Sequence, residues 1–176
     1  MRSAAIKAVD DATSLLISLP QAPWIEAVDK AVAIGNGVPL WATSSCALAV
    51  TGSRGRRAAL EGLVAAAVAS TISNQVIKRV TPRRRPIPVP RRLPKKSTPS
   101  LPSSHTATAF AYASAVAGRW PVAGLPAAAT AVAIAATRVH GRQHHLADVV
   151  TGAALGLLVG ASVAVASRKA FDTTTP

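Results

Sequence analysis

Long apolar stretches alternate with short polar ones along the chain. Runs with almost no ionisable side chains cover residues 31–50, 59–77, 105–118, 126–137 and 149–167. A helix needs about 20 mostly apolar residues to cross a bilayer. The first, second and last runs are long enough by themselves, whereas the two middle runs must borrow flanking residues. The pattern therefore predicts an all-α integral membrane bundle of five or six helices.

The N-terminal residues before the first run predict a different kind of segment. Asp10 and Asp11 interrupt the apolar stretch, so a cleaved signal peptide is not expected. The apolar side chains here fall roughly on one helical face opposite Asp10, which favours an interfacial amphipathic helix, with a flexible tail as the alternative. We expect an N-terminal amphipathic or flexible segment (1–23), a membrane domain (24–169) and a tail (170–176).

Glycine, proline and arginine mark the breaks between the predicted helices. A basic, glycine-containing loop is expected at 51–57, and Pro126 is expected to begin a helix that ends near residue 140. Segment 78–104 contains nine basic residues and seven prolines, so it cannot be one continuous helix or lie exposed in hydrocarbon. Two helices separate this segment from the turn at 138–148. Both are therefore expected at the same end of the bundle.

Composition narrows the choice of partners. The formal net charge is +13, from 20 Lys and Arg against 7 Asp and Glu. In a soluble protein this excess would suggest nucleic acid. Here the basic residues lie at the ends of apolar runs, without interleaved aromatic side chains to stack bases, so no nucleic-acid partner is expected. A lipid phosphate and membrane lipids are the expected partners, and an oligomer is left open.

Three polar clusters fall at the shared end of the bundle. They comprise Lys78 with Arg85 and Pro86, then Pro102, Ser103, Ser104 and His105, then Thr137 and Arg138 with His144 and Asp148. In order and spacing they resemble the three motifs of the type 2 phosphatidic acid phosphatase (PAP2) family. Those motifs are Lys-x6-Arg-Pro, Pro-Ser-Gly-His and Ser-Arg-x5-His-x3-Asp. The resemblance covers about residues 24–167 and implies a PAP2-like helical fold.

Two positions depart from the family pattern. Ser104 stands where the family has glycine, which narrows the backbone approach to a phosphate. Thr137 stands where the family has serine and keeps the hydroxyl. Neither departure removes a catalytic group.

The resemblance and the chemistry of the side chains assign the same phosphate-binding roles. Lys78, Arg85 and Arg138 supply fixed cations for a phosphate dianion, and the two arginines can bind its oxygens bidentately. Ser103 and Ser104 open a predicted helix, whose first amides and positive dipole end can hold the same oxygens.

The histidines and the aspartate supply the expected bond-breaking chemistry. His144 and Asp148 are four residues apart, so on a helix they share a face, and the carboxylate can orient the imidazole as a nucleophile. A phosphohistidine intermediate follows. His105 would protonate the departing lipid oxygen and then activate water. This cycle needs neither a metal nor another cofactor.

Two structural alternatives compete with this interpretation. His140, His144 and Asp148 recur at steps of four, beside His145, which is compatible with a metal site on one helical face. Such a site would place a metal cation beside the cationic side chains expected to bind phosphate, and the like charges would repel one another. The remaining basic residues of the loop are expected to be lipid-headgroup contacts or solvated charge: Arg79, Arg83, Arg84, Arg91, Arg92, Lys95 and Lys96.

The favoured function is a membrane lipid phosphate phosphatase. Its substrate would be an isoprenoid-linked phosphate, for example decaprenylphosphoryl phosphoribose, or a glycerolipid phosphate. A phosphotransferase that uses the same histidine and a non-enzymatic polybasic protein that binds anionic lipids are the alternatives. Apart from the phosphate ligands, eight basic residues lie at the active-site end and six at the other. This excess slightly favours a cytoplasmic active site in a multi-pass protein of the cell membrane.

Overall fold

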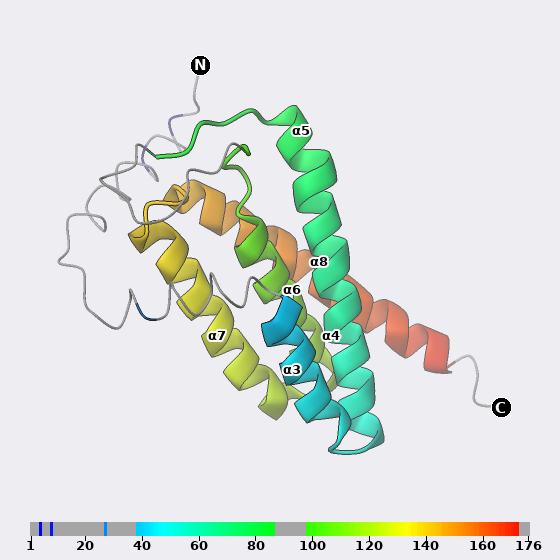
Figure 1. Cartoon of the computed structure of the whole chain (residues 1–176). Helices are drawn as coiled ribbons and strands as arrows, with labels where there is room; N and C mark the ends of the chain where they lie inside the picture. Colours follow the sequence, from blue (N-terminus) through cyan, green and yellow to red (C-terminus); the bar gives the residue numbers. More distant parts are fainter. Residues whose placement is uncertain (1–3, 5–7, 9–26, 28–37, 87–97, 173–176) are drawn as a thin grey trace.

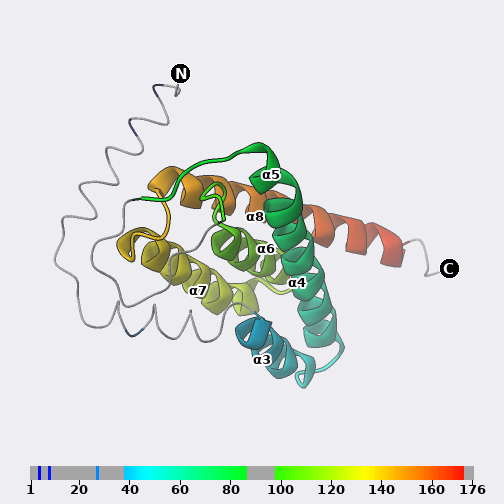
Figure 2. The same ribbon diagram turned by 45° about the horizontal axis from the view of Figure 1, so that its top comes forward.

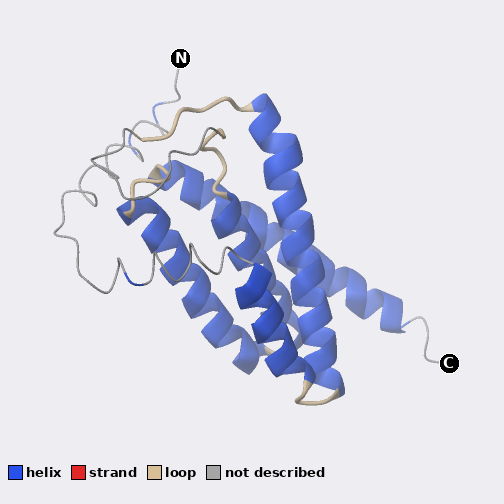
Figure 3. Cartoon of the chain, in the orientation of Figure 1, coloured by secondary structure: helices blue, strands red, loops and turns tan. Residues whose placement is uncertain are grey.

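The computed structural model describes residues 38–86 and 98–172, together with residues 4, 8 and 27. Within these residues all regular secondary structure is helical, as Figures 1 and 3 show, and the predicted all-α bundle is confirmed. Its elements are α3 (Val38–Ala49), α4 (Ser53–Thr71), the π-helical η1 (Ile72–Ile77), α5 (Lys78–Val80), α6 (Ser104–Arg119), α7 (Pro121–His140) and α8 (Leu146–Asp172). Apart from residues 4 and 8, the predicted N-terminal segment 1–23 lies outside the described residues.

The second helix begins earlier than predicted. Elements α4, η1 and α5 form one continuous helix, Ser53–Val80, so the expected basic loop at 51–57 is wrong for residues 53–57. The turn is made at Gly52, whose φ of 108° is costly for any residue with a side chain. Beyond it, arginine is a good helix former, and Arg56 donates its amide to the Gly52 carbonyl at 3.0 Å.

Helices α7 and α8 are also longer than predicted. Helix α7 begins at Pro121 rather than Pro126, because the first turn of a helix needs no amide donor and tolerates proline. Pro126 lies within the helix. Helix α8 runs from Leu146 to Asp172, beyond the apolar run 149–167, because its polar ends continue the same helix.

Among the residues that the structure describes, three helices are long and apolar enough to span a membrane: Ser53–Val80, Pro121–His140 and Leu146–Ala170. Large apolar side chains on their outer faces are exposed, among them Leu63 and Val68 on α4, Val132 on α7 and Leu158 on α8. Water would disfavour such a surface, whereas lipid would not. The chain is therefore a helical membrane protein, as its apolar runs predicted.

Helix α6 is the centre of the bundle. It packs against α4, α7 and α8, and Figure 2 shows it surrounded by these helices. Its buried positions are mostly alanine, and Tyr112 fills the space towards α3, with its ring centroid 4.6 Å from that of Trp41. Small side chains allow this close approach, which dispersion forces then stabilise.

A glycine stripe on α8 sets the distance to α6. Gly152, Gly156 and Gly160 each face the α6 backbone, and a Cβ on Gly152 would lie 2.6 Å from the Ser103 carbonyl oxygen. At the end of the stripe, the Ser103 amide donates to the Asp148 carbonyl at 2.9 Å. The stripe thus places the start of α8 directly beside the start of α6.

Candidate active site

Four chain segments meet at one end of the bundle, the upper end in Figure 1: the end of α5, the start of α6, the end of α7 and the start of α8. Hydrogen bonds join the loop after α5 to the turn between α7 and α8, as Arg85 does with Gln143. The prediction that segments 78–104 and 138–148 share one end is therefore confirmed for the described residues.

The turn between α7 and α8 presents His144 to the interior. Arg142 adopts a φ of 51°, which reverses the chain direction within a few residues. The amides of Gln143 and His144 both donate to the Arg138 carbonyl at 3.1 Å. The backbone is fixed at both sides, and the imidazole side chain is 3% exposed and points away from bulk solvent.

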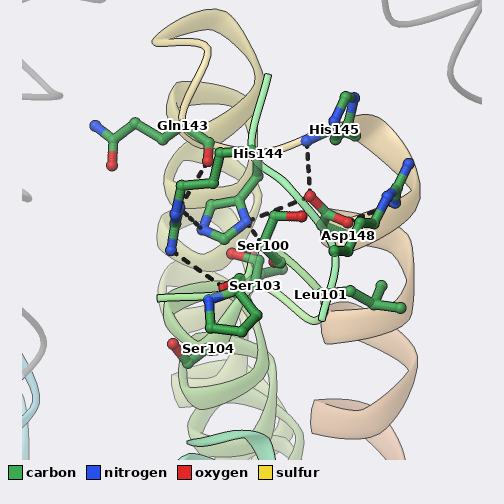
Figure 4. A network of polar contacts seen from close by, with 12 residues as sticks. Ser100, Leu101, Ser103, Ser104, Gln143, His144, His145 and Asp148 are labelled. Carbon is green, nitrogen blue, oxygen red and sulfur yellow. Dashed lines mark hydrogen bonds and ion pairs between the residues drawn. The ribbon is translucent and has the colours of Figure 1, made fainter. Parts of the chain in front are cut away.

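The imidazole has a defined tautomer. Its Nδ1 lies 2.8 Å from the carbonyl oxygen of Ser100 and 3.5 Å from Oδ2 of Asp148, as Figure 4 shows. Both neighbours are acceptors, so Nδ1 carries the hydrogen and Nε2 keeps a lone pair. Burial lowers the pKa of His144, and the cations Arg85 and Lys78 lower it further, against the opposing effect of Asp148. The ring is therefore a neutral, nucleophilic imidazole near pH 7.

Arg85 lies on the side of the ring that carries the lone pair. Its Nη1 is 3.1 Å from Nε2 of His144 and donates to the Gln143 carbonyl at 2.7 Å. Its Nε donates to the Thr98 carbonyl at 3.0 Å. A guanidinium held in this way can bind a phosphate oxygen at the point where Nε2 would meet the phosphorus atom.

Lys78 approaches the start of α6 from the end of the long helix. Its Nζ donates to Oγ of Ser104 and to Oδ1 of Asn74, each at 2.9 Å. The π-helical turn Ile72–Ile77 comes directly before it. Such turns are frequent at functional sites, because one extra residue redirects the side chains that follow.

Arg138 and Ser103, both expected to bind phosphate, form hydrogen bonds within the protein. Arg138 is buried, and its Nη1 donates to Oε1 of Gln143 at 2.9 Å. Ser103 is fully buried, its amide bonds the Asp148 carbonyl, and its hydroxyl accepts from Thr106 at 3.0 Å. The Ser103 amide thus joins α6 to α8, and the expected contact of Ser103 with phosphate stays a prediction.

The other histidines do not form a metal site. His105 is the second residue of α6 and partly buried at the active-site end. At the end of α7, Nε2 of His140 is buried, and no described residue forms a hydrogen bond with it. In the described part of the chain, no group of three or more His, Cys, Asp or Glu side chains could hold a metal ion, so the sequence-based alternative of a His140–His144–Asp148 site does not form.

Several residues of the network were not identified from the sequence. The backbone carbonyl of Gln143 accepts from Arg85, and the side-chain oxygen of Gln143 accepts from Arg138. Asn74, one helical turn before Lys78, accepts from the Lys78 ammonium group. Arg83, expected at lipid headgroups, forms an ion pair of 2.6 Å with Asp148 instead. The position of Asn74, four residues before Lys78, was a readable signal, whereas the contacts of Gln143 and Arg83 depend on tertiary structure.

Comparison with known proteins agrees with this geometry. The sequence profile of the PAP2 superfamily matches residues 59–172. The chain belongs to the PAP2 superfamily. The matched region contains all three motifs and every helix from the first turns of α4 onward. No curated protein sequence matches the chain closely enough to count as a relative.

A solved structure shares the PAP2 fold. It is described as the first transmembrane PAP2-type phosphatidylglycerolphosphate phosphatase from Bacillus subtilis. The likeness has a TM-score of 0.72 and 23% sequence identity, over 96% of this chain and 89% of that one. The likeness shows that the two chains share a fold.

Proposed function

We propose that this PAP2 protein hydrolyses a lipid phosphate monoester through a phosphohistidine intermediate on His144. The observation that carries the proposal is the position of Nε2: its lone pair lies 3.1 Å from Nη1 of Arg85, while Nδ1 is held from behind by the Ser100 carbonyl. A nucleophile and a phosphate-binding cation thus meet at one point, as an in-line displacement requires.

The reaction proceeds in two steps. In the first, the Nε2 lone pair of His144 forms a bond to phosphorus, the bond from phosphorus to the lipid oxygen breaks, and His105 gives its proton to that oxygen. In the second, His105 takes a proton from water, the water oxygen bonds to phosphorus, and the N–P bond breaks to release inorganic phosphate. Lys78 and Arg85 stabilise the charge on the phosphoryl oxygens, and Ser104 holds Lys78 in place.

Arg138 contacts the site through Gln143, to whose side-chain oxygen it donates. We propose that the phosphate gains a direct contact with Arg138 only if the Gln143 side chain turns aside.

No step in this cycle calls for a metal ion. Phosphate release from detergent-solubilised protein in the presence of a chelator tests the proposal. Release that needs added zinc would contradict it.

The substrate class follows from the position of the site at the end of membrane-spanning helices. A lipid phosphate can reach it sideways while its chains stay in the bilayer. We propose an isoprenoid-linked phosphate, with decaprenylphosphoryl phosphoribose as one candidate, or a glycerolipid phosphate, the class named for the Bacillus subtilis structure. A panel containing both classes, with a phosphorylated water-soluble alcohol as control, separates them by relative kcat/KM.

We propose that the active site faces the cytoplasm, because basic residues are slightly more numerous at its end. The exposed Arg84 offers a labelling position there. An Arg84→Cys variant in a Cys46→Ser background should resist an impermeant maleimide in intact cells and react after lysis. Labelling of intact cells would place the site on the outer face.

A further inference from the structure

Arg83 occupies one of the six unspecified positions of the first PAP2 motif, two residues before the motif arginine. Its side chain is only 11% exposed, and Nη1 donates at 2.6 Å to Oδ1 of Asp148, whose side chain is fully buried. A charged hydrogen bond between two largely buried groups is among the strong ones. Arg83 therefore belongs to the interior of the site, on the Nδ1 side of His144.

The backbone of Arg83 reaches the same place by a second route. Its carbonyl accepts the Ser100 amide at 2.9 Å, and the Ser100 carbonyl in turn lies 2.8 Å from Nδ1 of His144. The second acceptor near Nδ1, Oδ2 of Asp148 at 3.5 Å, belongs to the carboxylate that Arg83 binds through Oδ1. Both acceptors of the catalytic imidazole are thus tied to one residue.

We propose that Arg83 is a positioning residue, which fixes the Ser100 carbonyl and the Asp148 carboxylate at their distances from Nδ1 and so keeps the lone pair of His144 on Nε2. The catalytic part of this inference rests on the proposed function. Its structural part, the control of the imidazole by Arg83, does not.

The arrangement also has an electrostatic consequence. The charged groups that act on His144 are Asp148 from α8, Lys78 from α5 and Arg85 from the loop after α5. Arg83 offsets the charge of Asp148, and the shorter acceptor of Nδ1 is the neutral Ser100 carbonyl. Without Arg83, the carboxylate would be free to approach Nδ1 and stabilise the imidazolium, which is not a nucleophile.

A pair of neighbouring substitutions tests the proposal in the full-length protein. Arg83→Met should lower kcat roughly 10- to 100-fold, because the nucleophile is misplaced. It should also move the acid limb of the pH–rate profile upward by about one pH unit. Arg84→Met removes the same charge from an exposed position in the same loop and should leave both unchanged. Equal profiles for the two variants would overturn the proposal.

The Arg83→Lys variant separates the effect of the charge at this position from the effect of the guanidinium geometry. It also tests the proposal if the methionine variant fails to fold. It keeps the charge but loses the planar, two-nitrogen donor. We expect a reduced kcat with the acid limb close to its wild-type position. Wild-type kcat in this variant would contradict a positioning role.

An NMR titration of the His144 ring nitrogens needs no enzymatic activity. The signals can be assigned by their loss in His144→Gln, and Arg83→Met should raise the pKa of His144 where Arg84→Met does not. If wild-type protein released no phosphate from any lipid but this difference appeared, the proposed function would fail and the role of Arg83 would stand. Identical titrations in both variants would remove that role.

Discussion

The two ends of the bundle each contain a buried carboxylate paired with an arginine, yet their surroundings differ. At the end away from the site, Oε1 of Glu61 accepts Nη2 of Arg119 at 2.5 Å and Oγ of Ser167 at 2.5 Å. This network joins α4, α6 and α8. At the active-site end, Asp148 binds Arg83 but also receives the His145 amide and lies beside the His144 ring.

The difference shows which neighbouring groups distinguish an ion pair that only stabilises the fold from one that belongs to the proposed catalytic site. Glu61 accepts from Arg119 and Ser167, donors that hold helices together, and among the described residues no imidazole takes part in this network. Asp148 contacts an imidazole whose second nitrogen faces a cation suited to phosphate. The same electrostatics therefore stabilises the fold at one end and sets the state of a nucleophile at the other.

The largest expected effect is the loss of the nucleophile. His144→Ala should lower kcat at least about 10⁴-fold, because no adjacent group replaces Nε2. Phosphate release from the best lipid of the panel measures this loss, and size-exclusion chromatography checks the fold. Turnover within tenfold of wild type would assign the nucleophile to another residue.

Matched amide substitutions test the comparison of the two carboxylates. Asp148→Asn should lower kcat about 10²- to 10⁴-fold, because the oriented tautomer is disturbed. Glu61→Gln removes the same charge from the other end and should change kcat less than about threefold, since it does not touch the reacting groups. Both variants lose an ion pair, so kcat rather than stability discriminates between them. Equal losses of kcat would mean that Asp148 is only structural.

The opposite end should affect stability instead. Glu61→Ala leaves Arg119 without its buried carboxylate and should lower the free energy of unfolding by about 3 kcal/mol. The double variant Glu61→Ala/Arg119→Met should be less destabilised than the two single changes added together, because no charge is left uncompensated. Thermal unfolding in detergent measures all three variants, and simple additivity would show that the pair contributes no coupling.

The smallest effect concerns pH. Because burial lowers the pKa of His144, the neutral nucleophile should persist below the ordinary value of about 6.5, and kcat/KM should fall only at lower pH. Between the folded and unfolded pKa values the unfolded chain binds the additional proton, so stability also decreases as pH falls through this window. An acid limb centred above pH 7 would contradict a buried, neutral His144.

The sequence was sufficient for the helical class and for bringing the three motifs to one end. Apolar periods and helix-breaking residues carry that information, and the number of crossings fixes which loops share a side. The sequence did not show where α4 and α7 begin, because Arg54 and Pro121 are typical of loops but are also compatible with the first turn of a helix. Local composition does not distinguish those two situations.

The hydrogen-bond partners that orient the side chains of the site were harder to predict from the sequence. The acceptor nearest to His144 is a backbone carbonyl, that of Ser100, and any residue type provides one. Arg83 looked like one cation among many in a basic loop, and only the fold shows that it reaches Asp148. The motif positions predicted which side chains gather, whereas the partners that orient them depend on tertiary contacts.

The most direct test of the proposed phosphohistidine mechanism is detection of phosphate covalently bound to His144. His105→Ala protein should be mixed with a radiolabelled aryl phosphate lipid, whose leaving group needs no proton, and quenched in alkali, where phosphohistidine survives. We expect label on the peptide that contains His144, and none when His144→Ala is combined with His105→Ala. Label on another residue, or turnover by wild-type protein without any labelled intermediate, would contradict it.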